Sequence, residues 1–159
     1  MQLHRGRPIE ARVLLDDALS VARESDVGFH VLDRIYGTRI AAADSLAAVE
    51  EAEAAVRGPV ETCPTCRITL VVPAAIVAAR AGDIDRAAGH ARVAEMLATV
   101  IMRLPGWDAA VQEVKGHLAV AMEDATGATG HLRTAADGYR GCSQPLDEAR
   151  CRALLTALG

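Results

Sequence analysis

A Gly-Asp turn at Gly82-Asp83, between two apolar helical patterns, is the feature that most constrains the fold of this chain. Glycine readily adopts a positive φ, and an aspartate side chain can cap the helix that follows it. Alanine then recurs at helical offsets, at Ala87, Ala91 and Ala94, where a small side chain lets two helices approach closely. These residues together predict a pair of antiparallel helices that packs against similar neighbours.

The same pattern recurs along the chain, so we predict an all-α fold built as a right-handed superhelix of antiparallel helical hairpins, an α-solenoid. The turn anchors are Gly6, Ala43, Gly82 and Glu123. After each anchor, Ala or Leu occupies the same three positions. A single domain over residues 1–159 is expected, with an orphan helix over 8–24, hairpins over 29–56, 64–102 and 107–139, and a terminal helix over 145–158.

Composition favours helices over strands. The chain holds one Phe, one Trp and two Tyr, and its Val and Ile residues are too scattered to build a sheet. Pro73 falls within the first helix of the 64–102 hairpin and predicts either a kink or a helix that starts at Pro73 itself. The orphan helix lacks its partner, which predicts a homodimer or continuation into an upstream domain.

Charge and hydropathy argue against several classes of protein. The net charge is −4 and Lys115 is the only lysine, so no basic stripe for direct nucleic-acid binding is expected. The longest apolar run, 68–79, is too short to cross a bilayer, which needs about 20 residues. The N-terminus does not have the pattern of a signal peptide. We therefore expect a cytoplasmic protein without a membrane contact.

Three segments resemble the C-terminal tetratricopeptide-repeat region of large actinobacterial regulators. They are Arg34–Thr38, Cys63-Pro64-Thr65-Cys66 leading to Val72–Ala75, and Gln144–Ala153. In those regulators an ATPase domain precedes the repeats, and some carry a LuxR-type DNA-binding domain or a nucleotide cyclase domain. The resemblance implies a non-catalytic scaffold that binds a protein or peptide, as a module of a transcriptional regulator or signalling protein. The chain lacks a Gly-x-x-x-x-Gly-Lys-Ser/Thr phosphate loop, so the ATPase activity does not carry over.

The repeat register also predicts which residues line the concave groove of the superhelix. They are His30, Asp33, Ile40, Thr69, Val72, Ile76, Glu113, His117 and Val120. Two pairs among them, His30 with Asp33 and Glu113 with His117, have the spacing that places two metal ligands on one helical face. We prefer the simpler interpretation, that these are polar groove residues that are solvated or contact a peptide, over a metal site.

Cys63-Pro64-Thr65-Cys66 is the sharpest local motif. With Cys63 at an N-cap and Pro64 at the first helical position, both sulfurs would lie near the positive end of a helix, which favours thiolates. Three interpretations remain open: a helix start with reduced cysteines, a redox-sensitive pair, and a metal site completed by other residues. The first is preferred, and a thiol-redox or metal-responsive switch is the alternative function. No catalytic constellation and no cofactor motif is found, so we expect no enzymatic activity.

Overall fold

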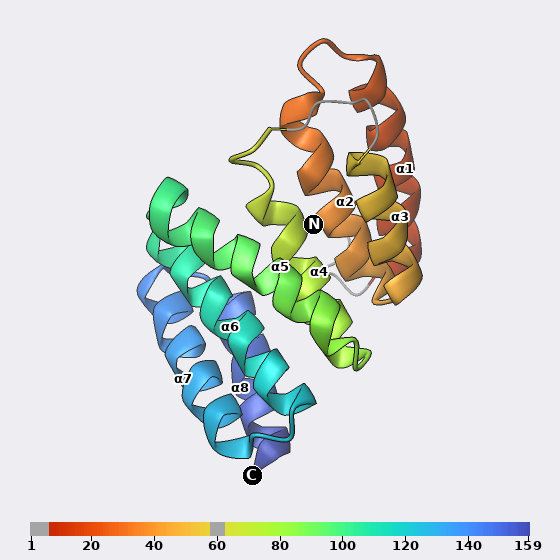
Figure 1. Ribbon diagram of the computed structural model, residues 1–159. Coiled ribbons are helices and arrows are strands. Elements are labelled where there is room, and N and C mark those ends of the chain that lie inside the picture. Colours follow the sequence, from red (N-terminus) through yellow and green to blue (C-terminus); the bar gives the residue numbers. More distant parts are fainter. Residues whose placement is uncertain (1–6, 58–62) are drawn as a thin grey trace.

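The computed structural model describes residues 7–57 and 63–159, and within them the protein is all-helical, with 83% helix and no strand (Figure 1). This confirms the all-α prediction. Eight α-helices and one π-helical segment follow in order: α1 (Pro8–Glu24), α2 (Phe29–Ala43), α3 (Leu46–Val56), α4 (Ile68–Arg80), α5 (Ile84–Met96), η2 (Leu97–Met102), α6 (Pro105–Ala121), α7 (Ala125–Gly141) and α8 (Pro145–Leu158). The anchor Gly6 lies outside the described residues.

Two of the turns have the geometry that the sequence predicts. Gly82 has a φ of 80°, and the Asp83 side chain accepts a hydrogen bond from the backbone N–H of Arg86 at 3.2 Å. Glu123 has a φ of 60°, and Asp124 caps α7 in the same way. At these turns a left-handed residue ends one helix and an aspartate begins the next.

The turn between α2 and α3 differs from the prediction by one residue. Here Asp44, with a φ of 48°, takes the left-handed position, and Ser45 caps α3 by accepting from the backbone N–H of Ala48 at 3.4 Å. Consequently Val49 is fully buried, whereas Ala48 is only partly buried. The anchor at Ala43 is therefore wrong by one position, because an aspartate adopted the conformation that glycine adopts at Gly82.

Small side chains lie where helices approach closely. Ala87 in α5 and Ala128 in α7 are fully buried. A Cβ atom at Gly116 in α6 would come within 2.7 Å of Cγ of Leu132. A Cβ at Gly37 would collide with a backbone oxygen of α4, so α2 and α4 are in near-backbone contact there. These contacts explain why Ala and Gly recur in step with the helices.

The helices pack mainly on their neighbours in the chain. In the described part, α2 packs on α4 and α4 on α6, while α1, α5 and α7 pack on α2, α4 and α6 respectively. The terminal helix α8 packs on α7. One main apolar core extends from α1 to α8 in the described part of the chain. The most apolar of the helices that form it is α4. The N-terminal helices α1–α3 and the C-terminal helices α6–α8 thus lie on opposite sides of α4 and α5 (Figure 1).

The structure also decides the question raised by Pro73. The helix α4 begins at Ile68 and continues through Pro73, so it does not start at the proline. At the other end of this hairpin, η2 extends α5 to Met102 before Arg103 adopts a positive φ of 48°. None of the described helices is long and apolar enough to cross a membrane.

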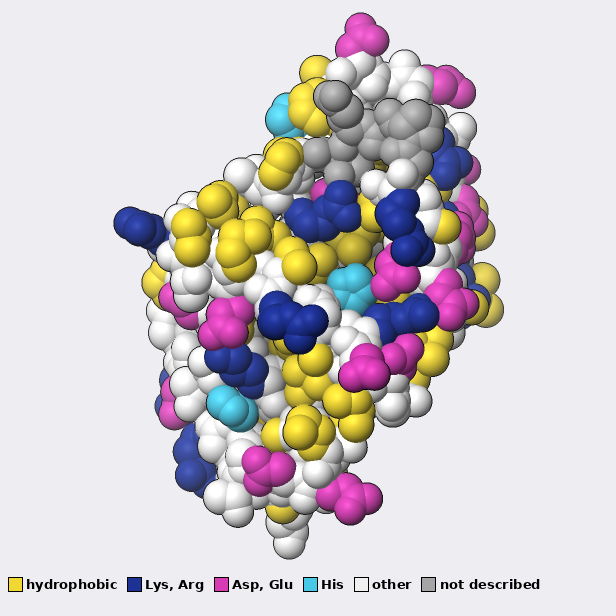
Figure 2. Space-filling model, viewed as in Figure 1, with side chains coloured by type: hydrophobic (Ala, Val, Ile, Leu, Met, Phe, Trp, Pro, Cys, Tyr) yellow, Lys and Arg dark blue, Asp and Glu magenta, His cyan; other side chains and the backbone are white. Residues whose placement is uncertain are grey.

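Exposed apolar side chains gather in two places. On α1 they include Ile9, Val13 and Val21. Near the end of α5 and along η2 they include Met96 and Ile101, and Figure 2 shows hydrophobic side chains clustered over this part of the molecule. The first group lies on α1, the helix for which the sequence analysis expects no partner within the chain, and the second group was not predicted.

Candidate functional site: a cysteine–histidine centre and an apolar cleft

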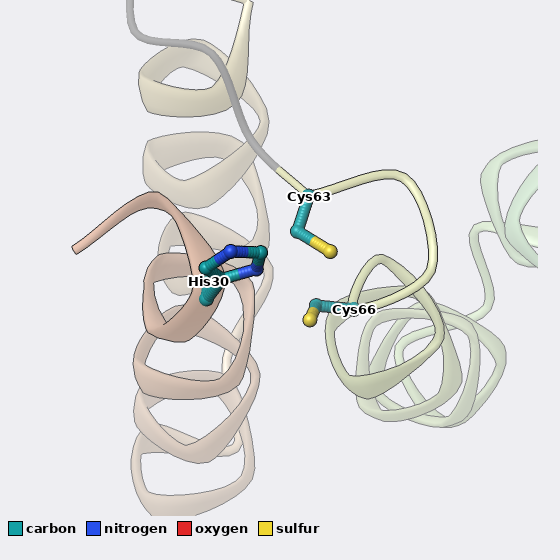
Figure 3. A group of neighbouring side chains, drawn as sticks. All are labelled: His30, Cys63 and Cys66. Carbon is teal, nitrogen blue, oxygen red and sulfur yellow. The ribbon is translucent and has the colours of Figure 1, made fainter. Parts of the chain in front are cut away.

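Two cysteines and a histidine from separate segments converge near the start of α2 (Figure 3). We call His30, Cys63 and Cys66 the Cys–His centre. One imidazole nitrogen and the two sulfurs all lie within 4.8 Å of one another. The backbone N–H of Cys63 donates to the carbonyl of Phe29 at 3.3 Å, which fixes the motif beside the first turn of α2. The fold thereby joins two features that the sequence presents separately.

The cysteine motif lies in a turn before α4 and not in the helix itself. The backbone N–H groups of Cys66 and Arg67 donate to the carbonyl of Cys63 at 3.0 and 3.2 Å, and α4 begins only at Ile68. The predicted N-cap at Cys63 with Pro64 as the first helical residue is therefore wrong. Turn hydrogen bonds, and not a helix terminus, set the environment of the sulfurs.

The two thiols differ in acidity. Hydrogen bonds from Thr65, Cys66 and His30 lower the pKa of Cys63 to about 6, and its Sγ lies 3.0 Å from Oγ1 of Thr65. Burial and the neighbouring Cys63 raise the pKa of Cys66. Cys63 is therefore a thiolate at neutral pH, and Cys66 is a thiol that can donate to it.

A buried carboxylate lies behind the centre. Asp33, one turn after His30 on α2, has no exposed surface, and among the described residues neither carboxylate oxygen has a hydrogen-bond partner. Its nearest opposite charge is the Arg67 guanidinium, whose Nε lies 3.5 Å from Oδ2. Burial raises the pKa of Asp33, with Arg67 acting in the opposite direction, and the Asp33 charge in turn raises the pKa of Cys66. A buried carboxylate that receives no hydrogen bond from the described residues therefore lies near the Cys–His centre.

Most of the predicted groove residues do not line an open groove. Asp33, Ile40 and Glu113 are fully buried, and Val72 and His117 are nearly so. Thr69 and Ile76 are partly buried, whereas His30 and Val120 are exposed. The prediction of a solvent-lined face is thus wrong for Asp33, Ile40 and Glu113, because helices pack over the side that the register assigned to the groove.

A cleft of about 450 Å³ opens elsewhere, between α4, α6, α7 and α8. We call it the α6–α8 cleft. Its apolar lining includes Val72, Leu104, Trp107 and Ala110, and its polar lining includes Gln144, Asp147 and Arg150. Among the predicted groove residues, Val72 contributes to it. The sequence analysis did not identify Trp107 as a residue of this cleft.

A charged network forms the polar wall of the cleft. Arg150 donates to both oxygens of Glu113, at 2.6 and 2.7 Å, and pairs with Asp147 at 2.8 Å. The Tyr139 hydroxyl donates to Glu113 at 2.7 Å. The guanidinium is therefore held in one orientation, while about half of its side chain remains exposed. A rigid donor beside an apolar wall is suited to binding a carbonyl-containing ligand.

Comparisons with known proteins add no assignment to this geometry. No protein-family model matches the chain, and neither a curated protein nor a solved structure is significantly similar to it. The residues described above are therefore the basis for any inference about function.

Proposed function

We propose that this chain is a non-catalytic helical-repeat module, of the tetratricopeptide type, that binds a protein partner as part of a cytoplasmic bacterial regulator or signalling protein. The proposed form is a right-handed superhelix. It is supported by the order of packing, in which α2, α4 and α6 stack in succession, and by the shared turn chemistry at Gly82 and Glu123. In repeat proteins such stacking leaves one extended surface for a partner.

The observation that carries the proposal is the α6–α8 cleft. Its volume of about 450 Å³ falls within the range of small ligand sites. We propose that an extended peptide segment places one apolar side chain between Val72 and Trp107. A backbone carbonyl of the same segment would accept from Arg150, which Glu113 and Asp147 already orient. Pre-organised donors reduce the entropy lost on binding.

Trp107 makes the proposal directly testable, because it is the only tryptophan of the chain. Peptides selected from a random display library would be titrated into the protein while Trp107 fluorescence is recorded. Affinity would be measured separately by the anisotropy of a labelled peptide. A selected peptide should change the Trp107 emission at the concentrations at which it binds.

Two matched variants locate the binding site. Leu104→Glu places a charge at the edge of the cleft, whereas Val21→Glu makes the same kind of change on α1; both side chains are exposed. We expect Leu104→Glu to weaken peptide binding at least tenfold, or about 1.4 kcal/mol, and Val21→Glu to leave it unchanged. Equal affinities in the two variants, or binding without a change in Trp107 emission, would overturn the proposal.

A further inference from the structure

We propose that the Cys–His centre binds one Zn²⁺ ion. Cysteine thiolate and histidine imidazole are the ligands that zinc prefers in proteins, and they select it over magnesium or calcium. The donors come from two segments, His30 on α2 and the Cys63–Cys66 turn before α4. This site shares no residue with the α6–α8 cleft, so it does not depend on the proposed peptide binding.

The donor geometry needs only a small adjustment to hold the ion. Zinc–sulfur bonds of about 2.3 Å and zinc–nitrogen bonds of about 2.0–2.1 Å place tetrahedral donors about 3.5–3.8 Å apart. The three donor atoms of the centre already lie within 4.8 Å of one another. His30 is exposed, which gives the ion a route from solvent, while Cys63 is buried. The remaining coordination position is open to water or to a ligand from a partner.

The charges around the centre also favour a divalent cation. Binding through both sulfurs releases the Cys66 proton, so that two thiolates and Zn²⁺ sum to zero. Asp33 and Arg67 form a second neutral pair nearby. Asp33 is fully buried near Cys66, and the described residues give it no hydrogen-bond donor. A buried carboxylate without a hydrogen-bond donor is costly even beside one guanidinium, and a second nearby cation offsets part of that cost. Asp33 would therefore favour the bound ion through its charge.

A bound ion would connect two parts of the fold. It would tie the first turn of α2 to the turn that precedes α4, and about two turns further along α2 the same two helices are in near-backbone contact at Gly37. Metal binding would therefore stabilise the packing of the N-terminal helices on α4, and metal loss would loosen it.

Cobalt spectroscopy tests the site without relying on any activity. The full chain would be reduced, freed of metal with a chelator, and titrated anaerobically with Co²⁺. We expect a thiolate-to-cobalt charge-transfer band that saturates at one equivalent and disappears when Zn²⁺ displaces the cobalt. The visible bands should be those of a tetrahedral site. Absence of the charge-transfer band would overturn the proposal.

Variants assign the ligands. Cys63→Ser and Cys66→Ser should each lose about half of the charge-transfer intensity or abolish binding, and His30→Ala should lower the affinity at least tenfold. Asp33→Asn should lower it about three- to tenfold, because it removes a nearby negative charge without removing a ligand. Cys142→Ser is the matched control, because this free cysteine lies outside the centre. An unchanged band in Cys63→Ser or Cys66→Ser would exclude the site.

Thiol protection keeps the test independent of variant folding. In the wild-type chain, Zn²⁺ should slow alkylation of Cys63 and Cys66 at least tenfold, measured by peptide mass spectrometry, and should leave Cys142 unaffected. It should likewise prevent a Cys63–Cys66 disulfide under mild oxidation. If that disulfide forms equally fast with and without Zn²⁺, the centre is a redox pair and the zinc proposal is wrong.

Discussion

The carboxylate of Glu113 holds three helices together, and its removal should destabilise the protein measurably. The side chain lies in α6, has no exposed surface, and accepts three hydrogen bonds. Two come from Arg150 in α8 and one comes from the hydroxyl of Tyr139 in α7. Glu113→Ala removes both acceptor oxygens, and with them all three hydrogen bonds, while the donor side chains of Arg150 and Tyr139 stay in place.

The expected loss follows from the burial of those donors. Tyr139 is buried, so a hydroxyl left without an acceptor costs about 1–3 kcal/mol. Breaking a fully buried ion pair costs about 3–5 kcal/mol, but the Arg150 side chain is 46% exposed and water can solvate it. The cost of losing the ion pair therefore falls below that range, to about 1–2 kcal/mol, and together with the unpaired Tyr139 hydroxyl we expect a total near 3 kcal/mol. For a chain of this size that corresponds to a fall of about 6–12 °C in Tm.

Urea unfolding followed by far-ultraviolet circular dichroism would measure the change. Tyr139→Phe removes one hydroxyl together with its hydrogen bond, so it should cost only about 1 kcal/mol. Glu113→Gln keeps acceptor capacity without the charge and should fall between the two. If Glu113→Ala lies within about 0.5 kcal/mol of the wild type, the network does not stabilise the contact between α6, α7 and α8, and the reasoning is refuted.

Three further predictions concern a close contact, a buried imidazole and a helix cap. Gly37→Ala should destabilise the protein by about 1–3 kcal/mol, because the added Cβ collides with α4. Gly89→Ala places its Cβ in open space and should stabilise the protein by about 0.5–1 kcal/mol. Equal effects of the two variants in urea unfolding would contradict the close contact at Gly37. Burial lowers the pKa of His117 in the folded protein. As the pH falls, the imidazole is therefore protonated in the unfolded chain before it is protonated in the folded one, and the stability of the fold should decrease below about pH 6.5. His117→Gln should show a smaller loss of Tm between pH 7.5 and pH 5.5 than the wild type, and equal losses would exclude this cause. Asp124→Ala should cost about 1 kcal/mol, because the side chain caps α7 with a hydrogen bond of 2.9 Å; a calorimetric Tm identical to that of the wild type would count against the cap.

The amino-acid sequence by itself determined the helices and most of their turns. Apolar periodicity predicted a helix over 8–24 and another over 145–158, and α1 and α8 span the same residues. The residue pairs Gly82-Asp83 and Glu123-Asp124 predicted turns that the structure contains. These features depend on residues close together in the chain, so local conformational preferences are enough to fix them.

Tertiary structure alone decided what covers each helical face. Periodicity showed on which face of its helix each of Glu113 and Asp33 lies. It could not show that Arg150 in α8 would bind Glu113, or that Arg67 would approach Asp33. The sequence also could not show that His30 meets the two cysteines, because this depends on how α2 packs on α4, with helix α3 between them in the chain. A pattern of 3.6 residues per turn records which side chains share a face, whereas the identity of the neighbour depends on contacts between distant segments.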